Sequence, residues 1–142
     1  MNGLKAKGKT IGEVEKLTGI SKRDLKYFIE QGLSQPSLKS ESGYWLYSDD
    51  NIQRVQLISL CRALDFPVSA IRTILIDPEA HWSEELERQI LRLTTQRDRI
   101  AVQLCLAQRL RYSKAEEALQ IHHSEQTQNE LADSARKEKM EV

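Results

Sequence analysis

Short apolar stretches with strong start and stop signals open the chain and predict two short helices joined by a tight turn. Thr10 and Glu13 have the spacing of a capping box, in which side chains satisfy free backbone N–H groups at a helix start. Gly19 can adopt the left-handed conformation that ends a helix, and Ser21 then caps the second helix. Two short helices joined by a turn of about three residues containing glycine are the signature of a helix-turn-helix.

The second predicted helix has one apolar face and one basic face. Leu25, Phe28 and Ile29 recur at helical spacing and are expected to face inward. A basic helix face is usually only solvated, but in a helix-turn-helix the second helix is the one that enters the DNA major groove. The residues predicted to contact DNA from this helix and its cap are Ser21, Lys22, Arg23, Lys26 and Tyr27.

A loop and a short strand follow the second helix and together predict a two-stranded wing. Residues 34–42 are rich in serine and include Pro36, whereas residues 43–47 have the alternation of a strand. The strand contains the aromatic residues Tyr44, Trp45 and Tyr47, which could contact DNA or pack in the core. We expect one or two of them to pack against the adjacent helices. The wing residues predicted to contact DNA are Lys39, Tyr44, Trp45 and Tyr47.

Two further helices complete the predicted DNA-binding domain, which extends over residues 10–77. Ser48 caps the third helix, and Cys61 lies at helical spacing between leucines, which indicates a core residue rather than a reactive thiol. A short fourth helix covers residues 69–76. Residues 1–9 precede the domain as a flexible arm with lysines on alternate positions, which is either solvated or touches DNA phosphates.

A single long helix is predicted beyond residue 78, with an apolar seam at heptad spacing that Arg97 interrupts once. Because a lone helix cannot bury such a stripe, the seam predicts a homodimer formed through residues 78–121. Trp82 is expected to pack between this helix and the DNA-binding domain. Residues 122–142 are polar and lack aromatic side chains, which predicts a disordered tail. The seam residues are Leu86, Ile90, Leu93, Ile100, Leu104 and Ala107.

Composition and charge narrow the class of protein. The 142 residues have no net charge, but residues 1–62 carry ten Lys or Arg against seven Asp or Glu, and residues 63–142 carry eleven against fourteen. A basic front half suits a protein that presents one face to a polyanion. The chain has no secretion signal or membrane-spanning stretch, which predicts a cytoplasmic location. It has no catalytic triad or phosphate-binding loop either, so neither an enzyme nor a cofactor is expected.

The histidines at the two ends of the long helix raise the hypothesis of a metal site shared by two chains. His81 precedes the long helix, and His122 and His123 follow its seam. In an antiparallel dimer the start of one helix lies near the end of the other, so imidazoles from two chains could converge on zinc, nickel or cobalt. Exposed polar histidines are the more common explanation, and no metal is assigned.

The order, spacing and residue types over residues 10–76 resemble those of the MerR family of bacterial regulators. The resemblance implies a mainly α fold with a winged helix-turn-helix, followed by a long antiparallel coiled-coil helix that joins two copies. It also implies operators with twofold symmetry inside promoters, which the protein bends and untwists for RNA polymerase. It is carried by Ile11-Gly12-Glu13-Val14, Leu17-Thr18-Gly19-Ile20-Ser21, Leu25-Lys26-Tyr27-Phe28, Gly32-Leu33, Pro36, Gly43-Tyr44-Trp45-Leu46-Tyr47-Ser48 and the segment from Arg62 to Phe66 with the Ile71 helix.

Several positions depart from the usual residues of that family. Lys26 stands in place of Arg, which keeps the charge but loses bidentate geometry. Asp24 stands in place of Thr, and an acid there could accept a hydrogen bond from cytosine or repel phosphate. The apolar pair at residues 28–29 replaces Tyr and Glu, which indicates a more buried side. Trp45 stands where the wing normally has Arg, and Lys39 is placed to replace that charge.

Two other functions fit parts of the pattern but fit the whole less well than a transcriptional regulator does. An architectural DNA-bending protein, such as a recombination-directionality factor, is the first, but such proteins often lack a long dimerisation helix. A structural coiled-coil protein is the second, and the basic helix-turn-helix argues against it. Because only about thirty residues follow Tyr112, the regulator is expected to respond to a partner protein, to its own abundance or to a ligand at the dimer interface.

Overall fold

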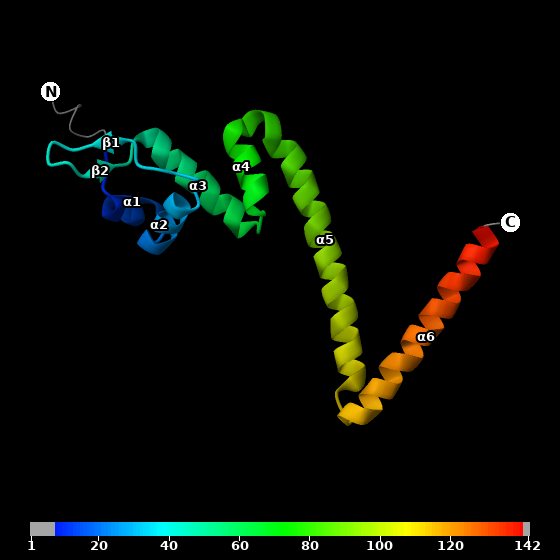
Figure 1. Ribbon diagram of the computed structural model, residues 1–142. Helices are drawn as coiled ribbons and strands as arrows, with labels where there is room; N and C mark the ends of the chain where they lie inside the picture. Colours follow the sequence, from blue (N-terminus) through cyan, green and yellow to red (C-terminus); the bar gives the residue numbers. More distant parts are fainter. Residues whose placement is uncertain (1–7, 141–142) are drawn as a thin grey trace. The chain divides into compact units, whose positions relative to one another are not determined.

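The computed structural model describes residues 8–140, which form six helices and one two-stranded sheet (Figure 1). The chain divides into two compact units, Met1–Arg92 and Leu93–Val142, which we describe separately. None of the helices in the described residues is long and apolar enough to cross a lipid bilayer. The elements are α1 (Ile11–Thr18), α2 (Lys22–Glu30), β1 (Leu38–Lys39), β2 (Trp45–Leu46), α3 (Asp49–Ala63), α4 (Val68–Ile76), α5 (Pro78–Leu110) and α6 (Ala115–Met140).

The capping signals that predicted α1 and α2 are formed in the structure. The Thr10 hydroxyl accepts from the Glu13 backbone N–H at 3.2 Å, and the Glu13 carboxylate accepts from the Thr10 N–H at 3.1 Å. That backbone hydrogen bond lowers the pKa of the Glu13 carboxyl. Gly19 ends α1 with a φ of 76°, and the Ser21 hydroxyl accepts from the Asp24 N–H at 3.1 Å. The predicted helix-turn-helix is therefore confirmed.

The core of the first unit lies between α1, α2, α3 and α4. Cys61 is fully buried in it, as its spacing predicted, and burial raises the pKa of its thiol. Phe28 is buried and Ile29 is half-buried, which agrees with the expectation that this side of α2 faces inward. The largest fully buried side chains are Tyr47, Phe28, Leu25, Leu33, Ile58, Ile71, Ile74, Val14, Val55 and Cys61.

The predicted wing is a short antiparallel hairpin. Leu38 of β1 pairs with Leu46 of β2, and Lys39 pairs with Trp45. Lys9 adds a bridge on the other side, where its N–H donates to the Tyr47 carbonyl at 3.0 Å and its carbonyl accepts from the Tyr47 N–H at 2.7 Å. The prediction that the flexible arm extends to residue 9 is therefore wrong at Lys9; residues 1–7 lie outside the described residues.

One amide side chain fastens the wing to α3. The Asn51 side-chain oxygen accepts from the Ser37 N–H at 3.1 Å, from the Ser37 hydroxyl at 2.7 Å and from the Ser48 N–H at 2.8 Å. In return, the Asn51 N–H donates to the Ser48 hydroxyl at 3.1 Å. This oxygen thus serves the cap of α3 and the entry to the wing at once.

Asn51→Ala is expected to lower the free energy of unfolding by about 1–2 kcal/mol, because it removes a capping box and leaves N–H donors without their partner. Urea unfolding followed by circular dichroism measures the change. Asn51→Asp keeps the acceptor oxygens and should lose less. An Asn51→Ala variant as stable as the wild type would show that the wing is held elsewhere.

α5 begins at Pro78, where the long helix was predicted to start, and its first turns pack against the core of the first unit. The Phe66 and Trp82 rings lie 6.2 Å apart between centroids, which confirms the expected packing of Trp82. Leu86 is half-buried against the same core. Part of the Leu86 side chain therefore packs on the first unit, and its place in the dimer seam stays a prediction.

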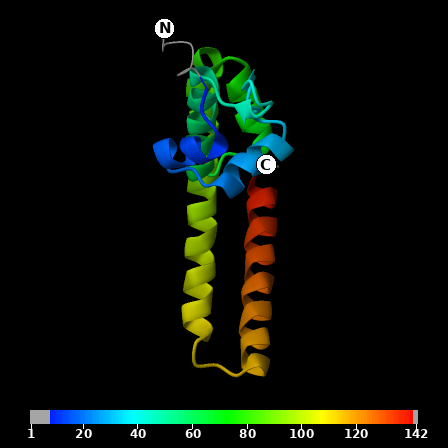
Figure 2. The same ribbon diagram turned by 90° about the vertical axis from the view of Figure 1, so that its left-hand side faces the viewer.

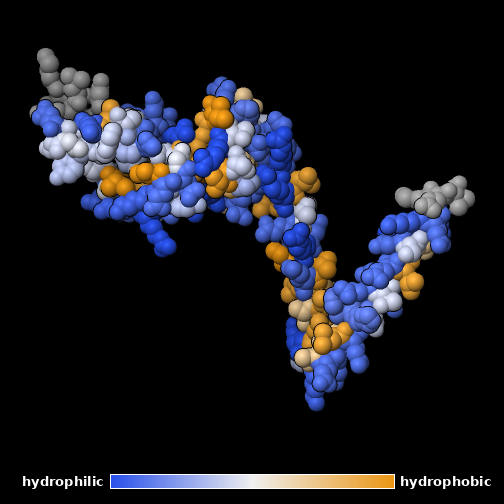
Figure 3. Space-filling model, in the orientation of Figure 1, coloured by the Kyte–Doolittle hydropathy of each residue, from blue (hydrophilic) through white to orange (hydrophobic). Residues whose placement is uncertain are grey.

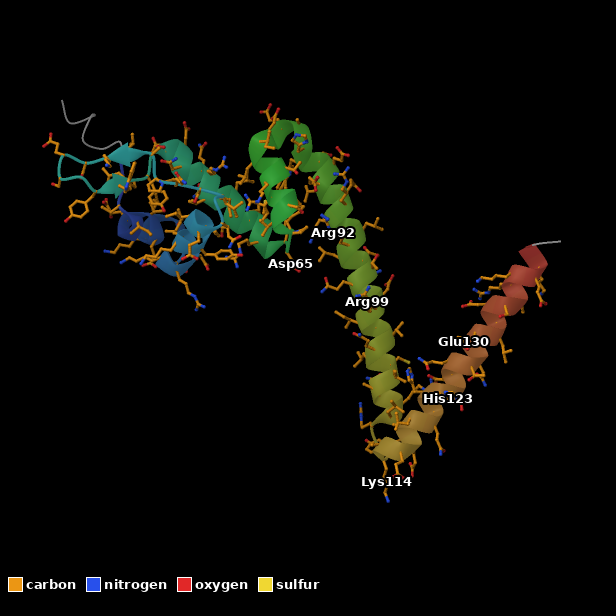
Figure 4. All side chains as sticks on the ribbon, viewed as in Figure 1. Asp65, Arg92, Arg99, Lys114, His123 and Glu130 are labelled. Carbon is orange, nitrogen blue, oxygen red and sulfur yellow. The ribbon has the colours of Figure 1, made fainter. Side chains whose placement is uncertain are left out.

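A buried glutamine fastens α5 to the turn between α3 and α4. The Gln89 side-chain N–H groups donate to the carbonyls of Leu64 and Asp65 at 2.7 and 3.0 Å, and its oxygen accepts from Arg92 at 2.8 Å. Asp65 is in the left-handed conformation, with a φ of 58°. Figure 4 labels Asp65 at this turn and Arg92 on α5. The start of α5 is thus packed into the first unit.

The second unit differs from the prediction for the end of the chain. The single helix predicted over residues 78–121 is broken at residues 111–114 into α5 and α6, a connection visible in Figure 2. Residues 122–140 of the predicted disordered tail are helical, because α6 continues to Met140. This stretch has no glycine or proline and is rich in Ala, Glu and Gln, which favour helix even without an apolar face. Arg109 of α5 forms an ion pair with Glu125 of α6.

Candidate nucleic-acid interface

The basic face of α2 lies at the surface of the first unit. Lys22, Arg23 and Lys26 are exposed, as is the capping residue Ser21. The opposite face of the helix is buried in the core. The structure therefore separates the two faces as the apolar spacing predicted, and leaves three cations available to a ligand.

The start of α2 is held against α1 by a contact that the sequence analysis missed. The Glu15 carboxylate accepts from the Lys22 backbone N–H at 2.7 Å, in addition to the cap that Ser21 provides. A Cβ atom on Gly12 would lie 3.5 Å from the Lys22 side-chain carbon Cε, so the Lys22 side chain passes over the first turn of α1. No local spacing signals this bond, because the two residues belong to different helices.

Tyr27 lies at the edge of the basic face and is only half-exposed. The Arg62 guanidinium of α3 covers its ring, 4.8 Å from the ring centroid. Arg62 also forms an ion pair with the Asp24 carboxylate, at 3.5 Å between Nη1 and Oδ1. Arg62 is therefore a residue of this surface that sequence reasoning missed, since 38 positions separate it from Asp24.

The wing presents two of its three aromatic side chains to solvent. Tyr44 and Trp45 are exposed, and the Lys39 ammonium lies 4.8 Å from the centroid of the Trp45 ring, a cation–π distance. Lys39 therefore brings a positive charge to the position where Trp45 stands, as the sequence analysis expected.

Tyr47 is the exception among the predicted contact residues. It is 1% exposed, and burial raises the pKa of its hydroxyl. The prediction that Tyr47 contacts DNA is therefore wrong: its backbone pairs with Lys9 and its ring fills the core. The expectation that one or two of the three wing aromatics would pack is confirmed by this residue.

Two arginines fix the segment that joins α2 to the wing. The Arg54 Nε–H donates to the Leu33 carbonyl at 2.6 Å, and an Arg72 N–H donates to the Gln31 carbonyl at 2.8 Å. Carbonyl groups at a helix end otherwise lack partners. These side chains therefore hold the C-terminal end of α2 in place.

A second candidate surface runs along α5, where apolar side chains lie at the surface (Figure 3). Leu93 and Leu104 of the predicted seam are 39% and 55% exposed in the single chain. Arg97, at the interruption, is exposed and paired with the neighbouring Asp98 at 3.3 Å. The other seam residues with exposed side chains are Ile90, Ile100 and Ala107.

The candidate metal ligands are distributed over both units. His81 lies in the first turn of α5, whereas His122 and His123 lie on α6. Within residues 8–140 of one chain, no three His, Cys, Asp or Glu side chains are grouped as a metal site would require. The imidazole site considered above would need residues from two chains, and no metal is assigned to this chain.

Comparison with known proteins places the first unit in a family. Residues 9–76 match the model described as MerR HTH family regulatory protein. The HTH-type transcriptional activator TipA of Streptomyces coelicolor is 35% identical over 80 residues, which are 56% of this chain and 32% of TipA. The HTH-type transcriptional regulator ZntR of Escherichia coli is 32% identical over 78 residues, which are 53% of this chain and 55% of ZntR. The chain thus spans about a third to about half of these relatives.

A solved structure extends the similarity beyond the matched residues. The N-terminal part of MtaN, the Bacillus subtilis multidrug transporter activator, has a TM-score of 0.66 and 26% identity to this chain. The alignment covers 73% of this chain and 98% of MtaN. The relatives are named as regulators and not as enzymes, in agreement with the sequence analysis. Residues 9–76, slightly less than half of the chain, are therefore a helix-turn-helix domain of the MerR type.

Proposed function

We propose that this protein is a transcriptional regulator that binds duplex DNA with the outward face of α2. The observation that carries the proposal is the set of three exposed cations on the second helix of a MerR-type domain: Lys22, Arg23 and Lys26. In this type of domain that helix reads base edges in the major groove, and lysine and arginine also bind phosphates. Lys39, Tyr44 and Trp45 on the wing would contact the backbone beside it.

The proposal includes a homodimer formed through the exposed seam of α5. Apolar side chains at heptad spacing on a long helix favour a partner helix with the same pattern. A twofold dimer would present two copies of α2 to an operator with twofold symmetry. By analogy with its family, the dimer would bend and untwist promoter DNA for RNA polymerase. The regulators among its relatives and the α5 seam favour this function over an architectural DNA-bending protein.

Replacing the central cations of α2 tests the DNA-binding surface. Arg23→Ala is expected to weaken operator binding by about 1–3 kcal/mol if Arg23 reads a base edge. Lys26→Ala should reduce the salt dependence of binding by about one charge if Lys26 contacts phosphate. Fluorescence anisotropy with labelled duplex over a range of salt concentrations measures both effects.

The matched control is Arg99→Ala, which removes an exposed arginine from α5, outside the DNA-binding domain (Figure 4). Its affinity and salt dependence should equal those of the wild type. If Arg23→Ala and Lys26→Ala also bound as the wild type does, the assignment of α2 as the recognition helix would be refuted.

A further inference from the structure

We infer that Arg62 of α3 is a positioning residue of the DNA-binding surface: it neutralises the Asp24 carboxylate of α2 and holds the Tyr27 ring in place. The inference rests on the proposed function, since it concerns how the same surface tolerates an acid. Arg62 lies outside the helix-turn-helix and was not among the predicted contact residues. It acts through α2, whatever contact its own side chain makes with DNA.

Three contacts tie the Arg62 guanidinium to α2. Its Nη1 lies 3.5 Å from the Asp24 Oδ1, and its central carbon lies 4.8 Å from the Tyr27 ring centroid and 5.7 Å from that of Phe28. Tyr27 and Phe28 in turn meet edge to face, with centroids 6.4 Å apart. A planar guanidinium can stack on an aromatic ring and pair with a carboxylate at the same time. One side chain therefore contacts consecutive turns of the recognition helix.

The position of Asp24 explains why it needs a partner. Asp24 is in the first turn of α2, where a carboxylate is favourable for the helix because it faces the positive end of the helix dipole. The same turn of a recognition helix lies closest to the DNA, where a free carboxylate would be repelled by phosphates. The Arg62 and Asp24 side chains are 42% and 50% exposed, so the pair lies at the surface and not in the core. Arg62 thus neutralises the Asp24 carboxylate, which stabilises the helix but would otherwise repel the DNA.

We therefore expect the Arg62–Asp24 ion pair to contribute little to the free energy of unfolding and more to the affinity for DNA. An exposed ion pair contributes little to stability. A carboxylate freed at a surface that approaches DNA opposes binding by an amount that grows as salt is lowered, because fewer ions screen it. The loss of Arg62 should therefore lower the affinity for DNA more than it lowers the stability of the fold.

A double-mutant cycle in the full chain tests the inference. Arg62→Ala should weaken binding to a labelled duplex on the order of tenfold at low salt, and less at higher salt. Asp24→Asn alone should bind at least as well as the wild type. The double variant Arg62→Ala with Asp24→Asn should recover most of the lost affinity, since no free carboxylate remains. Arg62→Lys keeps the charge and should stay closer to the wild type than Arg62→Ala.

Circular dichroism and thermal unfolding accompany each variant; if Arg62→Ala is unfolded, Arg62→Gln takes its place in the cycle. Recovery in the double variant supports the inference. The inference would be overturned if Arg62→Ala bound duplex DNA as tightly as the wild type does. It would also be overturned if Arg62→Ala lost the same affinity with and without Asp24→Asn, because Arg62 would then contribute only through its own contact with DNA. A wild-type protein that ignores duplex altogether would instead refute the proposed function.

Discussion

The homodimer proposed above is expected to dissociate into monomers when Leu93 and Leu104 are both replaced with aspartate. Both side chains are substantially exposed in the single chain and lie on the heptad seam of α5. Two unpaired carboxylates from each chain would enter an apolar interface, where a charge without a partner is costly. Light scattering coupled to size-exclusion chromatography measures the mass, and operator affinity should fall because one half-site must be bound alone.

The control for this change adds the same charge elsewhere on the same helix. Thr95→Asp with Val102→Asp alters two exposed positions on the side of α5 away from the seam. That variant should remain a dimer. A Leu93→Asp, Leu104→Asp protein that still runs as a dimer would mean that the seam is not the interface.

The largest effect on folding is expected at Phe28, whose ring is buried beneath the basic face of α2. Phe28→Ala removes a core aromatic side chain and should lower the free energy of unfolding by about 3–5 kcal/mol. This is a large part of the stability of a small domain, so DNA binding should be lost with the fold. Urea unfolding followed by circular dichroism measures the difference.

Tyr44→Ala is the matched control, because Tyr44 is an aromatic residue of the same unit with its ring exposed on the wing. It should change the free energy of unfolding by less than about 0.5 kcal/mol, as surface substitutions usually do. Equal losses from the two variants would show that Phe28 does not occupy the core position described above.

The first turns of α5, the helix proposed to form the dimer, are packed against the DNA-binding domain. Gln89 donates to two carbonyls of the turn after α3, and Trp82 packs on Phe66 beside it. Leu86, at the start of the same apolar stripe, also packs against the core of this domain. The helix that would set the spacing of two recognition helices is thereby anchored to the domain that carries them.

Local signals in the sequence were enough for most of the DNA-binding domain. The Thr10 capping box, the left-handed Gly19 and the Ser21 cap each act within four residues, so their consequences can be worked out without knowing the fold. The division of α2 into a buried and a basic face follows from helical spacing alone. The burial of Phe28 was expected for the same reason.

Contacts between distant parts of the chain could not be predicted in the same way. Tyr47 has the alternation of a wing residue, but its pairing with Lys9 and the closed core place its ring inside. The partner of Asp24 is Arg62 on another helix, and no spacing marks it. The part of α6 beyond residue 121 was not predicted for a different reason: this stretch has no apolar stripe, and only its intrinsic helical propensity favours a helix.

The central claim is that two copies of α2 read duplex DNA as a twofold pair. Selection of bound duplexes from a random library with the purified wild-type protein tests this most directly. The account predicts an enriched site made of two half-sites in inverted order, separated by about one or more turns of the double helix. Enrichment of a single unpaired site, or of no duplex at all at low salt, would contradict it.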